Sequence, residues 1–120
     1  MAKYDPDLSR IFQALSDPTR RAMLSRLMQG AAPVTELARP TGMALPTVMR
    51  HLSVLEDAAL ISSEKTGRTR LCQAQPAAFA AVTTWLDLQR AIWEARTDRL
   101  EALALTLTET DDDDPPQPRA

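Results

Sequence analysis

The stretch VTELARPTGMALPTVMRHLSVLEDA, residues 34–58, decides the fold. Its first part, Val34 to Arg39, can form about two helical turns before Pro40 ends the helix, because proline restricts the residue before it and lacks an N–H donor. Gly42 then marks a tight turn. Apolar residues follow at spacings of three, four and three: Leu45, Val48, Leu52 and Leu55. This spacing predicts a second helix from Leu45 to Ala58, and the pair is typical of a helix-turn-helix.

Two further helices are predicted before this stretch. Asp17 is a capping residue directly before Pro18, which suits the first turn of a helix that ends near Gly30. The apolar stripe of that helix consists of Met23, Leu24, Leu27 and Met28. Upstream, an amphipathic pattern is formed by Leu8, Ile11, Phe12 and Leu15.

After residue 58 the pattern changes to strands. Leu60 to Thr66 and Thr69 to Ala74 are short runs joined by Gly67-Arg68, and a two-residue connection with glycine predicts a β-hairpin. The predicted fold is mainly α with a small β-hairpin, which is the arrangement of a winged helix-turn-helix.

A long helix of about thirty residues is predicted from Pro76. Its main stripe, at alternating spacings of three and four, is Phe79, Val82, Leu86, Gln89, Trp93, Arg96, Leu100, Leu103 and Leu107. Because so small a body cannot cover this stripe, we expect a second copy of the chain to do so. The predicted domain covers residues 1–108, and the acidic, proline-rich residues 109–120 are predicted to be disordered.

Composition and charge bound the class of protein. The chain has 120 residues and a net charge of -2, yet residues 1–75 carry ten lysines and arginines against seven acids, and residues 76–120 carry four against nine. A basic body permits a polyanionic partner. The N-terminus shows no export signal and Cys72 is the single cysteine, so we expect a cytoplasmic protein without a disulfide and without a membrane segment.

Four segments together resemble the arsenic-repressor (ArsR) family of winged-helix repressors: IFQALSDPTRR (11–21), ELA (36–38), HLSVLEDAALI (51–61) and GRTR (67–70). The resemblance runs from about residue 8 to residue 104. It implies a homodimer whose first and last helices form the interface, with the hairpin flanking each DNA-reading helix.

The sequence departs from the family pattern at several positions. Family members often have serine where this chain has Ala44 and Met49, and lysine where it has Ser53. These changes leave open an alternative function, a dimeric protein-interaction module with weak or no DNA binding. The family's metal sensors carry a cysteine pair in the helix read here as Val34 to Arg39, or histidine and carboxylate ligands on the last helix; this chain has neither. We therefore predict no metal, no cofactor and no enzymatic activity.

The candidate DNA contacts come from three segments. On the helix from Leu45, the face opposite the apolar stripe includes Arg50, which can bond guanine edges in the major groove. His51 on its flank is a candidate phosphate ligand, and a lone histidine makes no metal site. Cations of the hairpin can follow the phosphate backbone, although a solvated hairpin would look the same. The full set is Thr35, Pro46, Thr47, Met49, Arg50, His51, Lys65, Arg68 and Arg70.

The predicted partners are double-stranded DNA and a second copy of the chain. The expected dimer interface consists of Leu8, Ile11, Phe12, Trp85, Leu86, Ile92, Trp93, Leu100 and Leu103. The leading hypothesis is a repressor that binds an inverted-repeat operator. The sequence leaves open the operator, a small-molecule effector, a redox role of Cys72 and a role for the acidic run at residues 111–114 in competing with DNA.

Overall fold

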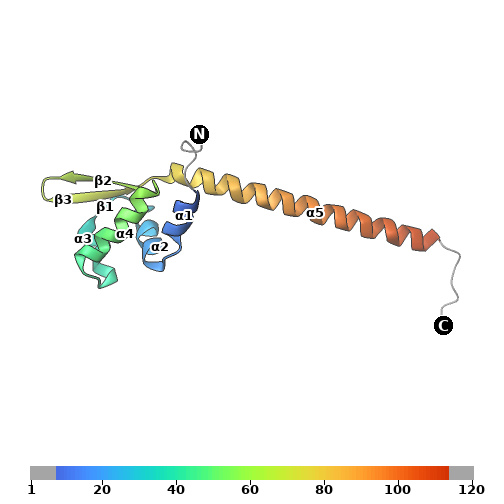
Figure 1. Cartoon of the computed structure of the whole chain (residues 1–120), viewed down its shortest axis with the longest axis horizontal. Coiled ribbons are helices and arrows are strands. Elements are labelled where there is room, and N and C mark those ends of the chain that lie inside the picture. The colour runs from blue at the N-terminus through green and yellow to red at the C-terminus, as the bar shows by residue number, and fades with distance from the viewer. Residues whose placement is uncertain (1–7, 114–120) are drawn as a thin grey trace. The chain divides into compact units, whose positions relative to one another are not determined.

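The helix-turn-helix and the hairpin are present in the computed structural model, which describes residues 8–113 (Figure 1). The chain divides after Thr83 into two units. The elements in chain order are α1 (Leu8–Leu15), α2 (Pro18–Leu27), β1 (Ala32–Pro33), α3 (Val34–Ala38), the 3-10 turn η2 (Arg39–Thr41), α4 (Leu45–Asp57), β2 (Ile61–Thr66), β3 (Thr69–Ala74), the 3-10 turn η3 (Pro76–Ala78) and α5 (Phe79–Asp113).

The start of α2 and both ends of α4 follow from local chemistry. The side chain of Asp17 accepts a hydrogen bond from the backbone N–H of Arg20 at 3.0 Å, which caps α2 as predicted. Gly42 takes the left-handed conformation, with φ +66°, between η2 and α4. At the other end of α4, Ala59 takes φ +63°, and Leu60 N–H bonds the carbonyl of Leu55 at 3.0 Å. This 6→1 bond closes a Schellman motif and turns the chain into β2.

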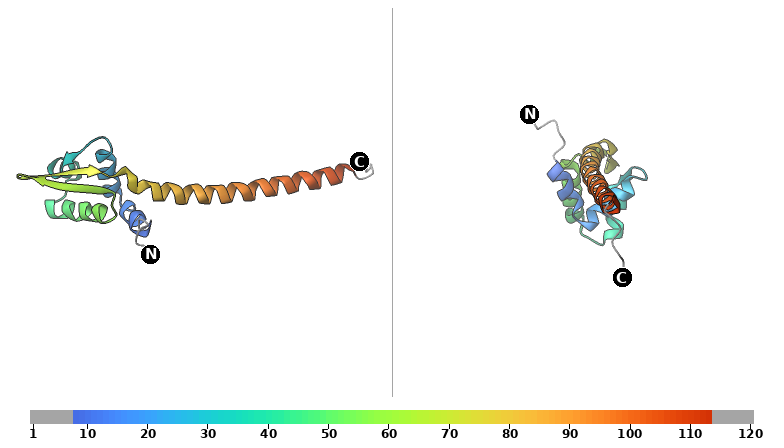
Figure 2. Two further views of the ribbon diagram at one scale, coloured as in Figure 1. Left: turned by 90° about the horizontal axis from the view of Figure 1, so that it is seen from above. Right: turned by 90° about the vertical axis from the view of Figure 1, so that its right-hand side faces the viewer.

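The sheet has one strand more than the predicted hairpin. Its order is β1-β3-β2, and both pairings are antiparallel. β1 was missed because two residues carry no periodicity, and it forms because Ala32 and Pro33 lie opposite Cys72 and Leu71 on the open side of β3. A proline is tolerated there because β1 is an edge strand. The tip of the β2–β3 hairpin, at Gly67, extends beyond the helices of the same unit (Figure 2).

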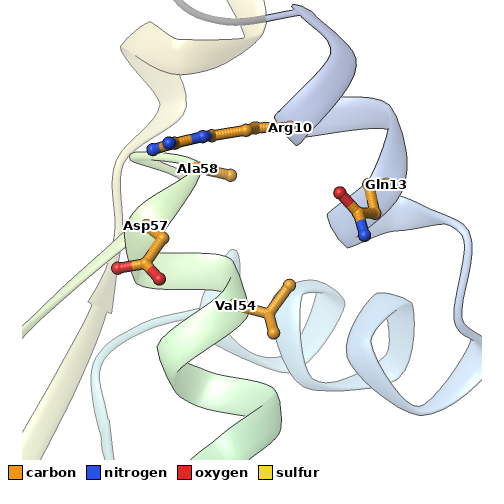
Figure 3. Close-up of a pocket in the computed structure, with 5 residues that line it drawn as sticks. All are labelled: Arg10, Gln13, Val54, Asp57 and Ala58. Carbon is orange, nitrogen blue, oxygen red and sulfur yellow. The ribbon is translucent and has the colours of Figure 1, made fainter.

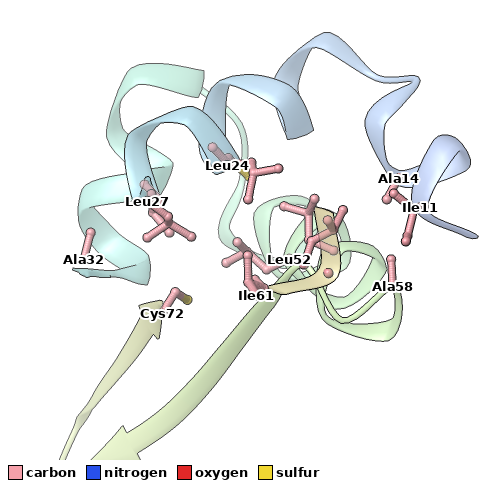
Figure 4. Packing of buried hydrophobic residues seen from close by; sticks show 14 of the residues in the cluster. Ile11, Ala14, Leu24, Leu27, Ala32, Leu52, Ala58, Ile61 and Cys72 are labelled. Carbon is pink, nitrogen blue, oxygen red and sulfur yellow. The ribbon is translucent and has the colours of Figure 1, made fainter. Parts of the chain in front are cut away.

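The core of the first unit collects buried apolar side chains from its helices and strands (Figure 4). Its fully buried members include Ile11 of α1, Leu55 of α4 and Cys72 of β3. The predicted stripe of α4 is buried at Val48, Leu52 and Leu55, but Leu45 is 51% exposed. Leu45 is the first residue of α4, and the elements that bury the later turns of this helix do not cover it.

Cys72 is expected to be inert toward thiol reagents in the folded protein. Burial raises the pKa of its thiol, the Glu56 carboxylate adds to the rise, and Arg70 opposes it. Since the thiolate is the nucleophile, native protein should stay unlabelled by iodoacetamide while protein unfolded in guanidinium takes up one label per chain. Rapid labelling of the native protein would contradict this assignment.

The long helix α5 ends at Asp113. Glu109 to Asp113, which the sequence analysis places in the predicted tail, continue this helix. No proline interrupts the sequence until Pro115, and a growing helix adds residues more readily than it starts. The rest of the predicted tail, residues 114–120, lies outside the described residues.

Candidate nucleic-acid interface

The outer face of α4 is where the sequence predicts base contacts. Val48, Leu52 and Leu55 fix the rotation of the helix because they are buried. Pro46 and Arg50 are exposed, and Thr47 and Met49 are half-buried. For the residues described, no hydrogen bond or ion pair ties the Arg50 guanidinium to the chain. Arg50 is thus available to an external partner.

A groove joins α3, α4 and the hairpin. Its cavity has a volume of about 190 Å³, and four of the predicted DNA contacts lie on its walls: Thr35, Met49, Arg68 and Arg70. Leu45 and Val34 form the apolar part of the groove wall. Residues from three separate segments of the sequence are therefore brought to one concave surface.

The hairpin cations differ in how they are held. Lys65 and Arg68 are exposed near the tip. Arg70 donates from Nη1 to the Ser63 hydroxyl at 3.0 Å, and Ser63 donates to Glu56 of α4 at 3.1 Å. This chain of hydrogen bonds links the hairpin to α4, so it orients Arg70, which lies opposite Lys65 across the two strands.

His51 lies on the inner side of α4, where it contacts Arg20. Its Nδ1 is 3.1 Å from Nη1 of Arg20 and 4.0 Å from the Asp17 carboxylate, and its side chain is 17% exposed. The hydrogen bond from the Arg20 backbone N–H lowers the pKa of Asp17, desolvation opposes this effect, and the charge of the Arg20 guanidinium adds to it. The sequence predicts the Asp17 cap, but no pattern in it signals the Arg20–His51 contact.

A second cavity, of about 270 Å³, lies between α1 and the end of α4 (Figure 3). Arg10 and Gln13 of α1 face Val54, Asp57 and Ala58 of α4. Val54, although it lies outside the apolar stripe of α4, therefore lines the contact with α1.

The predicted dimer residues fall in both units. In the first unit Phe12 is 40% exposed and Leu8 is half-buried, but Ile11 is fully buried in the core and has no surface for a partner. In the second unit, helix α5 exposes every predicted member at between 42% and 66%: Trp85, Leu86, Ile92, Trp93, Leu100 and Leu103.

Within residues 8–113, no three or more histidine, cysteine or acidic side chains are grouped as a metal site would need. Over the same residues, no helix has the length and apolar character to cross a membrane.

Known proteins of similar sequence are helix-turn-helix transcriptional regulators. A family model described as a helix-turn-helix domain matches residues 15–64. The chain is 44% identical over 88 residues to the HTH-type transcriptional regulator Rv2034 of Mycobacterium tuberculosis, covering 72% of this chain and 80% of that protein. It is 33% identical over 61 residues to the transcriptional repressor SdpR of Bacillus subtilis, covering 51% and 68%.

A solved structure agrees in fold and sequence. The chain is similar to the crystal structure of an ArsR family transcriptional regulator, with a TM-score of 0.70 and 52% sequence identity. The match covers 72% of this chain and 96% of that one. This similarity favours DNA binding over the alternative of an interaction module. The chain belongs to the ArsR family of DNA-binding, winged helix-turn-helix transcriptional regulators.

Proposed function

We propose that the protein is a homodimeric repressor that binds an inverted-repeat operator, with half-sites about 10 bp apart and one α4 helix in each major groove. The observation that carries the proposal is the groove in which α3, α4 and the hairpin present Thr35, Met49, Arg68 and Arg70 together. A duplex contacts a reading helix, the helix before it and a flanking wing at once, which is what this concave surface offers.

The contacts divide by chemistry. Arg50 reads a guanine edge, because its guanidinium has no partner described within the chain and can bond O6 and N7 together. Pro46, Thr47 and Met49 form the apolar part of the reading face and contact thymine methyl groups. Thr35, Lys65, Arg68 and Arg70 bind phosphates and set the register of the protein on the duplex.

Dimerisation is proposed to use Leu8 and Phe12 of α1 together with the apolar residues of α5. Large exposed apolar side chains on one helix are costly in water, and a second copy removes them from it. Trp93, 66% exposed, has the most surface to lose. The protein acts in the cytoplasm, where bacterial DNA lies.

The salt dependence of binding tests the DNA contacts. The affinity for DNA should fall linearly on a log-log plot against salt, since each phosphate contact releases counterions. Arg68→Ala removes one contact per protomer, so the slope should become shallower by about 2 for the dimer. Fluorescence anisotropy with labelled duplexes over a salt series measures this slope.

The matched control is Arg90→Ala, which removes an exposed arginine of α5 that is assigned no DNA contact. It should leave the slope unchanged. Absence of saturable binding to genomic fragments at low salt would refute the proposed function.

A further inference from the structure

Arg20, which lies at the start of α2, joins two other helices through one guanidinium. Its Nε donates to the carbonyl of Ala14 at 2.8 Å, and its Nη2 donates to the carbonyl of Gln13 at 3.0 Å. Both carbonyls belong to the last turn of α1, which lacks partners within the helix, and the Gln13 carbonyl also accepts from the backbone N–H and the hydroxyl of Ser16. The remaining contact, from Nη1, is the one to Nδ1 of His51 on α4.

The contact fixes the protonation of His51. A guanidinium carries only donors, so Nδ1 must accept, and the ring is then neutral with its proton on Nε2. The competing arrangement is a charged imidazole paired with Asp17. The distances favour Arg20, because 3.1 Å is a hydrogen bond whereas the 4.0 Å between Nδ1 and Asp17 is not. The Asp17 oxygen in question already accepts from the backbone N–H of Arg20 at 3.0 Å.

We propose that Arg20 is a positioning residue for the reading helix, and that His51 serves DNA binding by accepting this bond at Nδ1 and not by binding phosphate through Nε2. The inference rests on the proposed function of α4. It assigns a role in DNA recognition to a residue that touches no base.

The physical reason lies in the neighbour of His51. Arg50 precedes His51 on the same turn of α4. The hydrogen bond from Arg20 to the His51 ring therefore restrains the rotation of the turn that carries Arg50. A hydrogen bond with a charged donor is about twice as strong as a neutral one. The planar fork of arginine is required, because a lysine ammonium cannot reach three acceptors in fixed directions.

Two isosteric substitutions separate the two nitrogens. In His51→Asn the amide oxygen can take the place of Nδ1 and accept from Arg20, but nothing replaces Nε2. In His51→Gln the amide nitrogen can take the place of Nε2, but the acceptor for Arg20 is lost. We expect His51→Asn to bind operator DNA within about threefold of the wild type and His51→Gln to bind about tenfold more weakly, since Nη1 of the half-buried Arg20 loses its acceptor. Thermal melting curves of both variants serve as the control that they are folded.

The opposite order of the two variants, or an equal loss in both, would overturn the proposal. Nitrogen NMR of the imidazole in the free protein gives an independent reading. At neutral pH we expect Nδ1 to be unprotonated and Nε2 to carry the proton, and we expect Arg20→Gln to lose this preference. A proton on Nδ1 in the wild type would also overturn the proposal. Because this spectrum needs no DNA, failure of the wild type to bind any duplex would refute the proposed function separately.

Discussion

Trp93→Asp is expected to convert the protein to a monomer and to weaken operator binding by about a hundredfold or more, because two linked half-sites bind far more tightly than separate ones. Trp93 is 66% exposed on α5 and stands on the stripe that also carries Leu86, Leu100 and Leu103. An aspartate at this position would place an unpaired charge in an apolar contact, which costs several kcal/mol. In a two-fold interface the cost is incurred twice, so the dimer dissociation constant should rise by about ten-thousandfold or more.

Analytical ultracentrifugation at micromolar concentration measures the change in mass. The control is Ala91→Asp, which adds the same charge to the same helix at about 200° from Trp93 around the axis. Ala91→Asp should stay dimeric and bind DNA as the wild type does. A Trp93→Asp protein that remained dimeric would show that this face of α5 is not the interface.

Arg50→Ala is expected to lower the preference for operator over random DNA by about a hundredfold. One bidentate contact between arginine and guanine is worth about 1–3 kcal/mol of discrimination, and the dimer has two of them. The operator is obtained first by selecting bound fragments from the host genome. The measured quantity is the ratio of the two dissociation constants at one salt concentration.

Lys65→Ala provides the contrast, because Lys65 lies near the tip of the hairpin and is assigned to phosphate. It should weaken both complexes by a similar factor and leave the ratio unchanged. An unchanged ratio in Arg50→Ala would mean that another residue reads the sequence.

The elements of the first unit could be predicted from the sequence because their signals are local. Apolar spacings of three and four residues indicate a helix. Asp17-Pro18 marks the start of α2, and Pro40 and Gly42 mark the break between α3 and α4, whatever the tertiary surroundings. Gly67 likewise marks the hairpin turn, where the chain takes φ +63°. The end of α4 at Ala59 carries no such signal, because a left-handed alanine is not recognisable in a sequence.

The candidate site was predicted in part. The opposite face of α4 follows from its buried stripe, so Arg50 could be named from periodicity alone. The position of His51 could not, because its partner Arg20 is 31 residues away and the contact exists only once α1, α2 and α4 are packed.

By itself, then, the sequence determined the helices and the two strands of the hairpin, because those choices depend on neighbours a few residues apart. Only the tertiary structure decided that Ala32-Pro33 becomes a strand, that Ile11 belongs to the core, that Leu45 is exposed and that Arg20 meets His51. Each of these outcomes depends on which residues pack against a given residue in the folded protein. Such partners are far apart along the chain, so no periodic pattern in the sequence indicates them.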